Sequence, residues 1–586
     1  MKKYLFITLM IFLSATLLST GIMEYSQLKP GMEGEGKTIF KGTKIETFRF
    51  KILGFLDNFS PGKNLIIAEL KSPELNDIGV IAGMSGSPVY IDGKIIGSVS
   101  YGFSFSKKPI AGITPIEDIL KVSDYSSPSY SIDISDIKIE FDKKNISLIA
   151  ERLKKEILGK LNITSENNVS PIKLISTSRG INNSIQSYLK PLASQAPQIK
   201  MEKNFEKSIK QNFDIKGADA VSIPLVRGDF EYSSSGTVTY VKGNKIYMFG
   251  HPFFNMGKVS FPIHKAEVIS VVPSYQESFK LSSTKNMIGA VTQDRFSSVA
   301  GELGKAPYMI PMQIFFKGRN KKFKLEMINH PLLTPALTQI SIANIFLTEI
   351  QQFGFNSLKV RGKIFIENEK NIIIDDLFSG GNSYNELADL ILAVNFFLMN
   401  NKEKEIKIQK IDFDVEVSET VKRANIENVL IQKNEFRPGE IIDIKILIRN
   451  DRGKLVRENI KIKAPNLKKG APFQLLIADK KAISKFDAKN IKSSFFPSKL
   501  NSLIRAINNL RKNNRIYIKL VSPEKGLFVK GHEYSSLPSG LRNMFIYNTK
   551  SSDQITIKNS TITEYQMEVQ SIISGSKLFK LKIRER

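Results

Sequence analysis

The sequence predicts a mainly β protein with two β-rich stretches in its N-terminal part. Residues 28–125 and 218–380 both alternate apolar and polar side chains over short runs, which is the pattern of half-buried strands. Asp92 and Gly93 separate two apolar runs, which is a strong hairpin signal, and residues 242–244 (Lys-Gly-Asn) separate another such pair. The segment between these stretches is rich in Ser, Asn and Lys, so the two β-rich stretches are separated by a segment of different composition.

The rest of the chain changes character several times, so we expect further domains. An apolar run over 385–397 predicts a helix, and an alternating run over 441–448 follows a Pro-Gly turn. In chain order, we expect a signal peptide at 1–22, a first β-rich half at 28–125, an α/β insert or connector at 126–217, a second β-rich half at 218–380, a helical connector at 381–415, a β-sandwich-like domain at 420–470 and a mixed α/β tail at 471–586.

The amino-acid inventory excludes several kinds of chemistry. There are no cysteines, which excludes disulfides, thiolate metal sites and a cysteine nucleophile. The chain has 4 histidines, so a mechanism that needs an imidazole must use His251, His264, His330 or His532. We find no metalloprotease helix motif, phosphate-binding loop or dinucleotide fingerprint. The sequence therefore predicts neither a cofactor nor a catalytic metal. Asp375 and Asp376 form a weak candidate for a hard cation, and we favour a solvated turn for them.

The N-terminus has the pattern of an export signal. Lys2 and Lys3 precede an almost unbroken apolar run from Tyr4 to Leu18, and small residues follow up to Gly21. This order is typical of a cleaved secretory signal peptide. A retained N-terminal membrane anchor is the alternative, because the run approaches the length that spans a bilayer. We expect an exported protein that is periplasmic, associated with the cell envelope, or secreted.

The formal net charge of +28 has two interpretations. It can describe an ordinary solvated basic surface, or a surface that is attracted to an anionic partner such as the cell envelope. No nucleic-acid-binding motif accompanies the charge, so nucleic acid is not an expected partner. The sequence makes no prediction of the oligomeric state.

Residues 83–88 (Gly-Met-Ser-Gly-Ser-Pro) have the composition of an exposed nucleophile turn. A serine hydroxyl needs a fixed backbone and a nearby base before it can attack a carbonyl. The flanking glycines permit a tight turn with unusual dihedral angles and allow a substrate to come close. The backbone N–H groups of Gly83 and Ser85 could then form an oxyanion hole. A glycine-rich β-turn without chemistry is the plainer interpretation of this string.

The motifs together resemble the SpoIVB peptidase family. The resemblance rests on residues 83–88, on 92–97 (Asp-Gly-Lys-Ile-Ile-Gly) and on the stretch 235–251. It implies a chymotrypsin-like serine protease fold, a Ser85 nucleophile, a His251 base and protein or peptide substrates. In the sporulation protease of that family the histidine segment precedes the serine segment. Here it follows, so the resemblance implies a permuted order of the two barrel halves.

The group that would orient His251 is less well defined by the sequence. His251 lies at a predicted strand end between Gly250 and Pro252, where it could face a cleft. The resemblance places Ser72 where the sporulation protease has an acid, and Asp294 lies on the histidine half. A Ser/His dyad, or a backbone carbonyl in place of the acid, remains an alternative.

Two functions follow from these observations. The first is an exported serine endopeptidase that forms an acyl-enzyme on Ser85. The second is a catalytically inactive, envelope-associated binding or scaffold protein with a protease-like fold, because fold alone does not establish activity.

Overall fold

The computed structural model describes most of the chain. The described residues are 21–125 except 77, 104 and 105; 150–153, 155, 169–172, 174–182 and 185; 214–349 except 276; 356–490; and 499–584 except 525, 530, 531, 535–539 and 541–553. Most of the predicted signal peptide and of the predicted insert lies outside these residues. Among the described residues, no helix is both long and apolar enough to cross a membrane.

The chain divides into two compact units. Unit 1 comprises Met1–Tyr130, Leu158–Met309 and Glu326–His330, and unit 2 comprises Ser131–Ile157, Ile310–Leu325 and Pro331–Arg586. Strands dominate both units, so the predicted mainly β class is confirmed.

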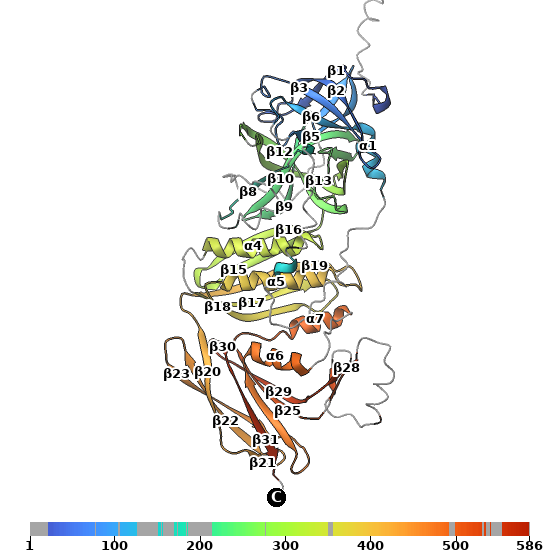
Figure 1. The fold of residues 1–586 in the computed structure, drawn as a ribbon. Helices are drawn as coiled ribbons and strands as arrows, with labels where there is room; N and C mark the ends of the chain where they lie inside the picture. The colour runs from blue at the N-terminus through green and yellow to red at the C-terminus, as the bar shows by residue number, and fades with distance from the viewer. Residues whose placement is uncertain are drawn as a thin grey trace, which may run out of the picture. The chain divides into compact units, whose positions relative to one another are not determined.

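The first barrel of unit 1 is formed by the segment that carries Ser85 (Figure 1, blue). Its strands close in the order β1, β2, β3, β6, β5 and β4, because β4 pairs with both β1 and β5. The elements are η1 (Tyr25–Gln27), β1 (Glu33–Thr38), β2 (Glu46–Ser60), β3 (Lys63–Lys71), β4 (Pro88–Ile91), β5 (Lys94–Phe103), β6 (Ile110–Pro115), α1 (Ile116–Leu120) and η2 (Lys121–Asp124). The alternating apolar side chains point inward and form one core, which includes Phe48, Phe50, Ile66 and Val99.

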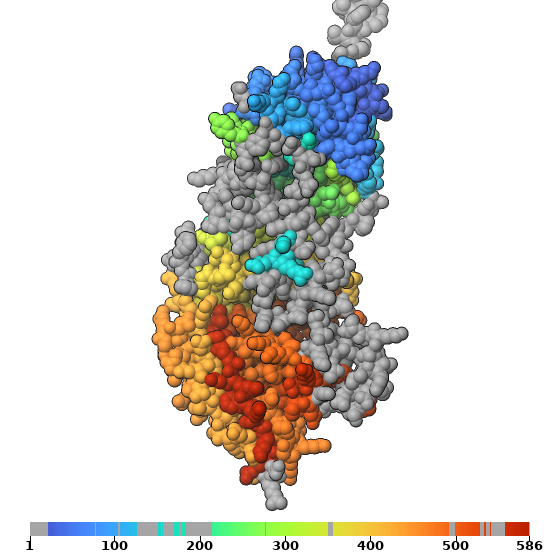
Figure 2. All heavy atoms as spheres, viewed as in Figure 1, coloured from blue at the N-terminus to red at the C-terminus, as the bar shows by residue number. Residues whose placement is uncertain are grey.

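The second barrel of unit 1 closes in the same way. Its strands follow the order β9, β12, β13, β14, β11 and β10, and β10 pairs back to β9. They are β9 (Ala220–Gly228), β10 (Glu231–Lys242), β11 (Lys245–Met248), β12 (Gly257–Val272), β13 (Phe279–Arg295) and β14 (Ser298–Leu303). The predicted hairpin at residues 242–244 joins β10 to β11. In the space-filling view, residues of the second barrel (green) lie against those of the first (blue) (Figure 2).

Two short strands of the predicted insert extend these barrels. β7 (Val169–Pro171) pairs with β5 of the first barrel, and β8 (Ile175–Arg179) pairs with β10 of the second. β7 and β8 therefore belong to the sheets of the first and the second barrel, respectively.

The histidine-bearing half is shorter than the sequence indicated. The second barrel ends at Leu303, whereas residues 310–325 and 331–380 belong to unit 2. The alternation of apolar and polar residues indicates that β15 (Met309–Phe316) is a strand. It does not indicate which sheet the strand joins. In the structure it pairs in parallel with β19 (Ile408–Ser418), a partner about a hundred residues later in the sequence.

Unit 2 begins with a sheet covered by two helices. The sheet has the order β18, β17, β19 and β15, and α4 and α5 lie side by side (Figure 1, yellow). The predicted helical connector is α5, which packs against β17 and β18. The bounds are η5 (Lys317–Arg319), β16 (Lys321–Ile328), α4 (Leu333–Glu349), β17 (Asn356–Ile366), β18 (Ile372–Gly380) and α5 (Ser383–Met399).

A β-sandwich follows, and it draws on a longer stretch than the predicted 420–470. One sheet has the order β23, β22, β20 and β30, and the other β21, β31, β24, β25 and β29. Both contribute to one apolar core, so the predicted tail supplies most of the second sheet. The bounds are β20 (Arg423–Ile431), β21 (Glu435–Phe436), β22 (Ile441–Asn450), β23 (Leu455–Lys463), β24 (Pro472–Ala478), β25 (Arg515–Ser522), β29 (Ser560–Glu568), β30 (Ile572–Ser574) and β31 (Ser576–Ile583).

Smaller elements complete unit 2. α6 packs against β24 and β25, α7 packs against β18, and a further sheet has the order β27, β26 and β28. Their bounds are α6 (Lys480–Asn490), α7 (Leu500–Asn508), β26 (Gly526–Val529), β27 (His532–Tyr534) and β28 (Gln554–Ile557).

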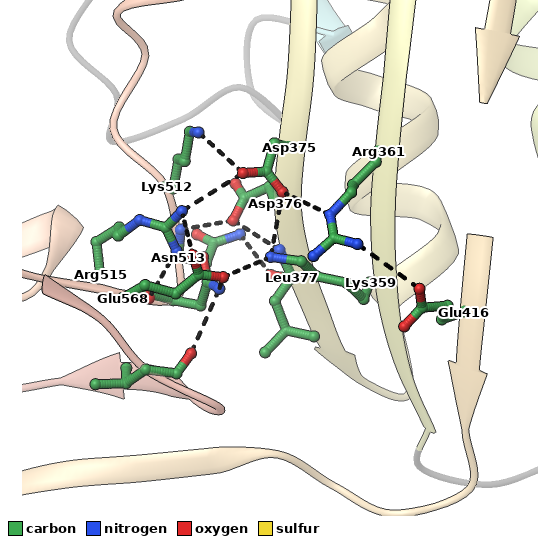
Figure 3. Close-up of polar contacts among 12 residues, drawn as sticks. Lys359, Arg361, Asp375, Asp376, Leu377, Glu416, Lys512, Asn513, Arg515 and Glu568 are labelled. Carbon is green, nitrogen blue, oxygen red and sulfur yellow. Dashed lines mark hydrogen bonds and ion pairs between the residues drawn. The ribbon is translucent and has the colours of Figure 1, made fainter. Parts of the chain in front are cut away.

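Asp375 and Asp376 lie on β18 among cations rather than in a solvated turn (Figure 3). Asp375 pairs with Lys359 and Lys512 at 3.2 Å and with Arg515 at 3.4 Å. Burial alone would raise the pKa of Asp375, but hydrogen bonds and charges from the two lysines hold it below its usual value. Asp376 is buried and accepts a hydrogen bond from the backbone N–H of Asn513 at 2.7 Å. The pair therefore joins β18 to the segment that leads into β25.

We expect Asp375→Asn to destabilise unit 2 by roughly 1–3 kcal/mol, because several cations would lose their counter-charge. This loss of unfolding free energy is smaller than the loss on breaking a fully buried ion pair, because the site is partly hydrated. Calorimetric unfolding at neutral pH measures it, with Asp451→Asn on an exposed turn as the matched control. Equal unfolding temperatures for both variants would contradict the structural role.

Candidate active site

The turn that carries Ser85 has a strained, well-held backbone. Gly83 and Gly86 have φ angles of +90° and +92°, a region that favours glycine. Within the turn, the N–H of Ser87 donates to the carbonyl of Met84 at 2.8 Å, and the N–H of Gly86 donates to Val99 of β5 at 2.8 Å. β4 starts directly afterwards at Pro88, so the C-terminal side of the turn is anchored to the first barrel, whereas Ala82 on its N-terminal side exchanges hydrogen bonds with Ser278 and Lys280.

Two backbone N–H groups of this turn make no hydrogen bond with the described residues. The N–H groups of Gly83 and Ser85 have no acceptor among the described residues, although their neighbours are hydrogen-bonded. A pair of unused N–H donors beside a nucleophile is what an oxyanion hole requires. The positions predicted for the oxyanion hole are therefore the ones with spare donors.

Strand β10 of the second barrel holds the same turn from the other side. The N–H of Thr237 donates to the carbonyl of Ser85 at 2.9 Å, and its Oγ1 donates to the carbonyl of Gly83 at 2.9 Å. Thr239 Oγ1 donates to the carbonyl of Gly86 at 3.0 Å. Residues 235–240 entered the sequence argument only as part of a resemblance. The hydroxyls of Thr237 and Thr239 position the Ser85 turn, a role that hydrophobic patterning does not reveal.

The chain that leads into His251 packs directly on the Ser85 turn. A Cβ on Gly86 would lie 2.5 Å from the backbone N of Phe249, so the two backbones touch. Phe249 has a φ of +73°, which is a strained value for a bulky residue, and Gly250 donates back to Met248 at 2.9 Å. The carbonyl of Gly250 accepts a hydrogen bond from Thr114 Oγ1 of the first barrel at 2.7 Å. The barrel interface thus brings the serine and histidine segments together.

The environment of His251 defines its protonation. Its Nδ1 lies 2.8 Å from the carbonyl of Pro252, and a carbonyl can only accept, so Nδ1 carries the proton. Burial lowers the pKa of His251 to about 4, against the opposing effect of the backbone of Pro252 and Ile172. The imidazole is therefore neutral at pH 7, with the lone pair on Nε2.

Ser85 and His251 share an unusual property. Both side chains are buried, and neither Ser85 Oγ nor His251 Nε2 has a hydrogen-bond partner among the described residues. Buried polar atoms are nearly always paired, so two orphaned atoms on touching segments call for an explanation. They are the two atoms that a serine protease mechanism uses.

Neither candidate for a third member contacts His251. Asp294 is fully buried and accepts hydrogen bonds from the N–H groups of Phe253 at 2.7 Å, Phe254 at 2.8 Å and Met256 at 3.2 Å. It caps the loop that follows His251 and so supports the histidine through the backbone. Ser72 Oγ donates to Glu74 instead. The backbone carbonyl of Pro252, the alternative left open by the sequence, holds the ring.

A buried cation behind the turn was missed by the sequence analysis. Lys280 is 3% exposed, and its stem lies beside Gly83. Its Nζ donates to Thr38 Oγ1 at 2.7 Å, which also accepts from Ser87 Oγ at 2.9 Å. Burial lowers the pKa of Lys280 to about 7. Its position in an ordinary alternating strand gave no signal of this role.

The other histidines are elsewhere. His264 lies on β12, where Nδ1 is 2.7 Å from the carbonyl of Lys285, and His330 packs against Phe261. His532 lies on β27 of unit 2. Among the described residues, no cluster of three or more His, Asp or Glu side chains could hold a metal ion.

The fold of unit 1 is thus a double β-barrel of the chymotrypsin-like class, with a buried serine and histidine where the barrels meet. Comparison with protein-family models agrees: residues 20–120 match the SpoIVB peptidase S55 family. The matched residues cover the Ser85 barrel through α1 and stop before the barrel that carries His251. Comparisons with curated proteins and with solved structures returned no match.

We expect Gly86→Ala to destabilise unit 1 strongly. A positive φ costs a non-glycine residue about 1–3 kcal/mol, and the new Cβ would also lie 2.1 Å from the carbonyl oxygen of Thr237. Urea unfolding measures the loss. Gly54→Ala on β2 is the matched control, because nothing lies within 4 Å of its Cβ position. A Gly86 variant as stable as the control would show that the turn is not held as described.

Proposed function

We propose that this protein is an exported serine endopeptidase with Ser85 as nucleophile and His251 as general base. The observation that carries the proposal is the pair of buried, unpartnered atoms, Ser85 Oγ and His251 Nε2, on two segments in contact. The spare N–H groups of Gly83 and Ser85 and the peptidase family match over residues 20–120 support it.

The chemistry follows from the protonation of His251. Ser85 Oγ bonds to the carbonyl carbon of the substrate while its proton passes to Nε2, and the N–H groups of Gly83 and Ser85 bind the oxyanion. The C–N bond then breaks as Nε2 returns the proton to the leaving amine. Water hydrolyses the resulting ester by the same steps in reverse. The carbonyl of Pro252 holds the tautomer that this cycle needs.

A second candidate function rests on one observation. No carboxylate among the described residues hydrogen-bonds to His251, so nothing stabilises an imidazolium as strongly as a triad acid does. This favours an inactive scaffold or binding protein with a basic surface for an anionic envelope partner. For both functions we propose an exported location, on the basis of the N-terminal apolar run.

The test is covalent labelling of the full-length protein with a fluorophosphonate over a long incubation. We expect a single label on Ser85 that is absent in Ser85→Ala and in His251→Asn. Ser270→Ala, which removes an exposed serine of β12, should label like the wild type. A folded wild-type protein that never labels on Ser85 would favour the scaffold.

The pH dependence tests the base separately. Because burial depresses the pKa of His251 to about 4, the free enzyme keeps its neutral base in mild acid. The labelling rate should therefore stay nearly constant from pH 7 to about pH 5 and fall only as the pH approaches that pKa. An acid limb near the ordinary histidine value of about 6.5 would contradict the buried environment.

A further inference from the structure

The β7 segment, Val169–Ile172, lies on the edge of β5 that leads to Ser85. The pairing is antiparallel, with Val169 opposite Phe103 and Pro171 opposite Tyr101. It continues one residue further, where the N–H of Ile172 donates to the carbonyl of Ser100 at 2.9 Å. Addition of an extended segment to a free sheet edge is a common way to bind a peptide.

The next position on the same edge belongs to the nucleophile turn. Ser100 accepts the hydrogen bond from Ile172. At the neighbouring residue, the carbonyl of Val99 accepts from the N–H of Gly86, and the N–H of Val99 donates to the carbonyl of Ser87. The β7 segment therefore runs along β5 toward the turn that carries Ser85, and Ile172 occupies the position on the β5 edge next to Gly86 and Ser87. The backbone of Ile172 also raises the pKa of His251, against the larger effect of burial. A peptide bound in this register would bring the carbonyl of its fourth residue to the catalytic pair.

The side chain of Ile172 is buried in the first barrel, as the side chain of a bound peptide would be. It is 4% exposed and belongs to the apolar core of the first barrel. A cavity of about 240 Å³ lies along the segment, lined by residues that include Gly79, Gly102, Ser170 and Ile172. Ser85 itself is 0% exposed, so no substrate can reach its hydroxyl in this structure. After the β7 segment, β8 pairs with β10, which ties the segment to both barrels.

We propose that the β7 segment is an intramolecular, substrate-like inhibitor, which must leave β5 before an extended peptide with an aliphatic fourth residue can reach Ser85. The proposal rests on the peptidase function above and adds its regulation and its preferred substrate. It explains why both catalytic atoms are buried and without partners: the segment excludes water and substrate together.

The test uses the full-length protein and Ile172→Pro, which removes the N–H that donates to Ser100. Ile172→Val is the matched control, since it keeps the N–H and a β-branched aliphatic side chain. Hydrogen exchange over residues 169–172 reports release of the segment. If the open state is a minor one, release should raise the fluorophosphonate labelling rate of Ser85 by roughly 10- to 1,000-fold, and the control should label like the wild type. In the released variant, the pH below which the labelling rate falls should also rise toward the ordinary pKa of histidine.

A second measurement does not depend on that variant's folding. The aldehyde of acetyl-Val-Ser-Pro-Ile should protect wild-type Ser85 from labelling, whereas the aldehyde of acetyl-Val-Ser-Pro-Asp should not. Equal labelling of wild type and a released variant, or equal protection by the two aldehydes, would overturn the inhibitory role alone. A released, folded variant that never labels on Ser85 would overturn the peptidase function and with it this proposal.

Discussion

The site depends on one contact, the packing of the Gly86 backbone against Thr237 and Phe249. There is no room for a side chain at Gly86, because its Cβ would overlap backbone atoms of both neighbours. This close approach lets the second barrel hold the Ser85 turn by its carbonyls and brings His251 to the same junction. It also accounts for the strained backbone of Phe249. Gly86 and Phe249, which both have positive φ angles, lie where the two barrels touch.

The same contact does not depend on the order of the two halves in the chain. Each barrel closes on itself, so neither needs the other to complete its sheet. The junction needs only that a serine turn from one barrel meets a strand end from the other. Chain order can change without changing that meeting, as it does among unrelated proteases with equivalent catalytic groups. What the order does change is the connection, which here contributes β7 and β8.

The sequence predicted the parts of the structure that are encoded locally. Turn signals such as Asp92-Gly93 and the glycines around Ser85 located the hairpin and the nucleophile turn, because those backbone angles demand particular residues. Pairing between distant segments could not be predicted. The strand β15 joins β19, the sandwich takes most of its second sheet from residues after 470, and the threonines of β10 hold a turn some 150 residues earlier. A threonine in a strand looks the same in sequence whether it faces solvent or the Ser85 turn.

The central claim is that Ser85 and His251 form a catalytic pair and that the β7 segment occupies the edge of β5 where a substrate would bind. It is tested most directly with a diphenyl phosphonate of acetyl-Val-Ser-Pro-Ile, followed by peptide mapping and hydrogen exchange on the same sample. The account predicts one adduct, on Ser85, accompanied by faster exchange over residues 169–172. An adduct on another residue, no adduct on folded protein, or an adduct formed while that segment stays protected would contradict it.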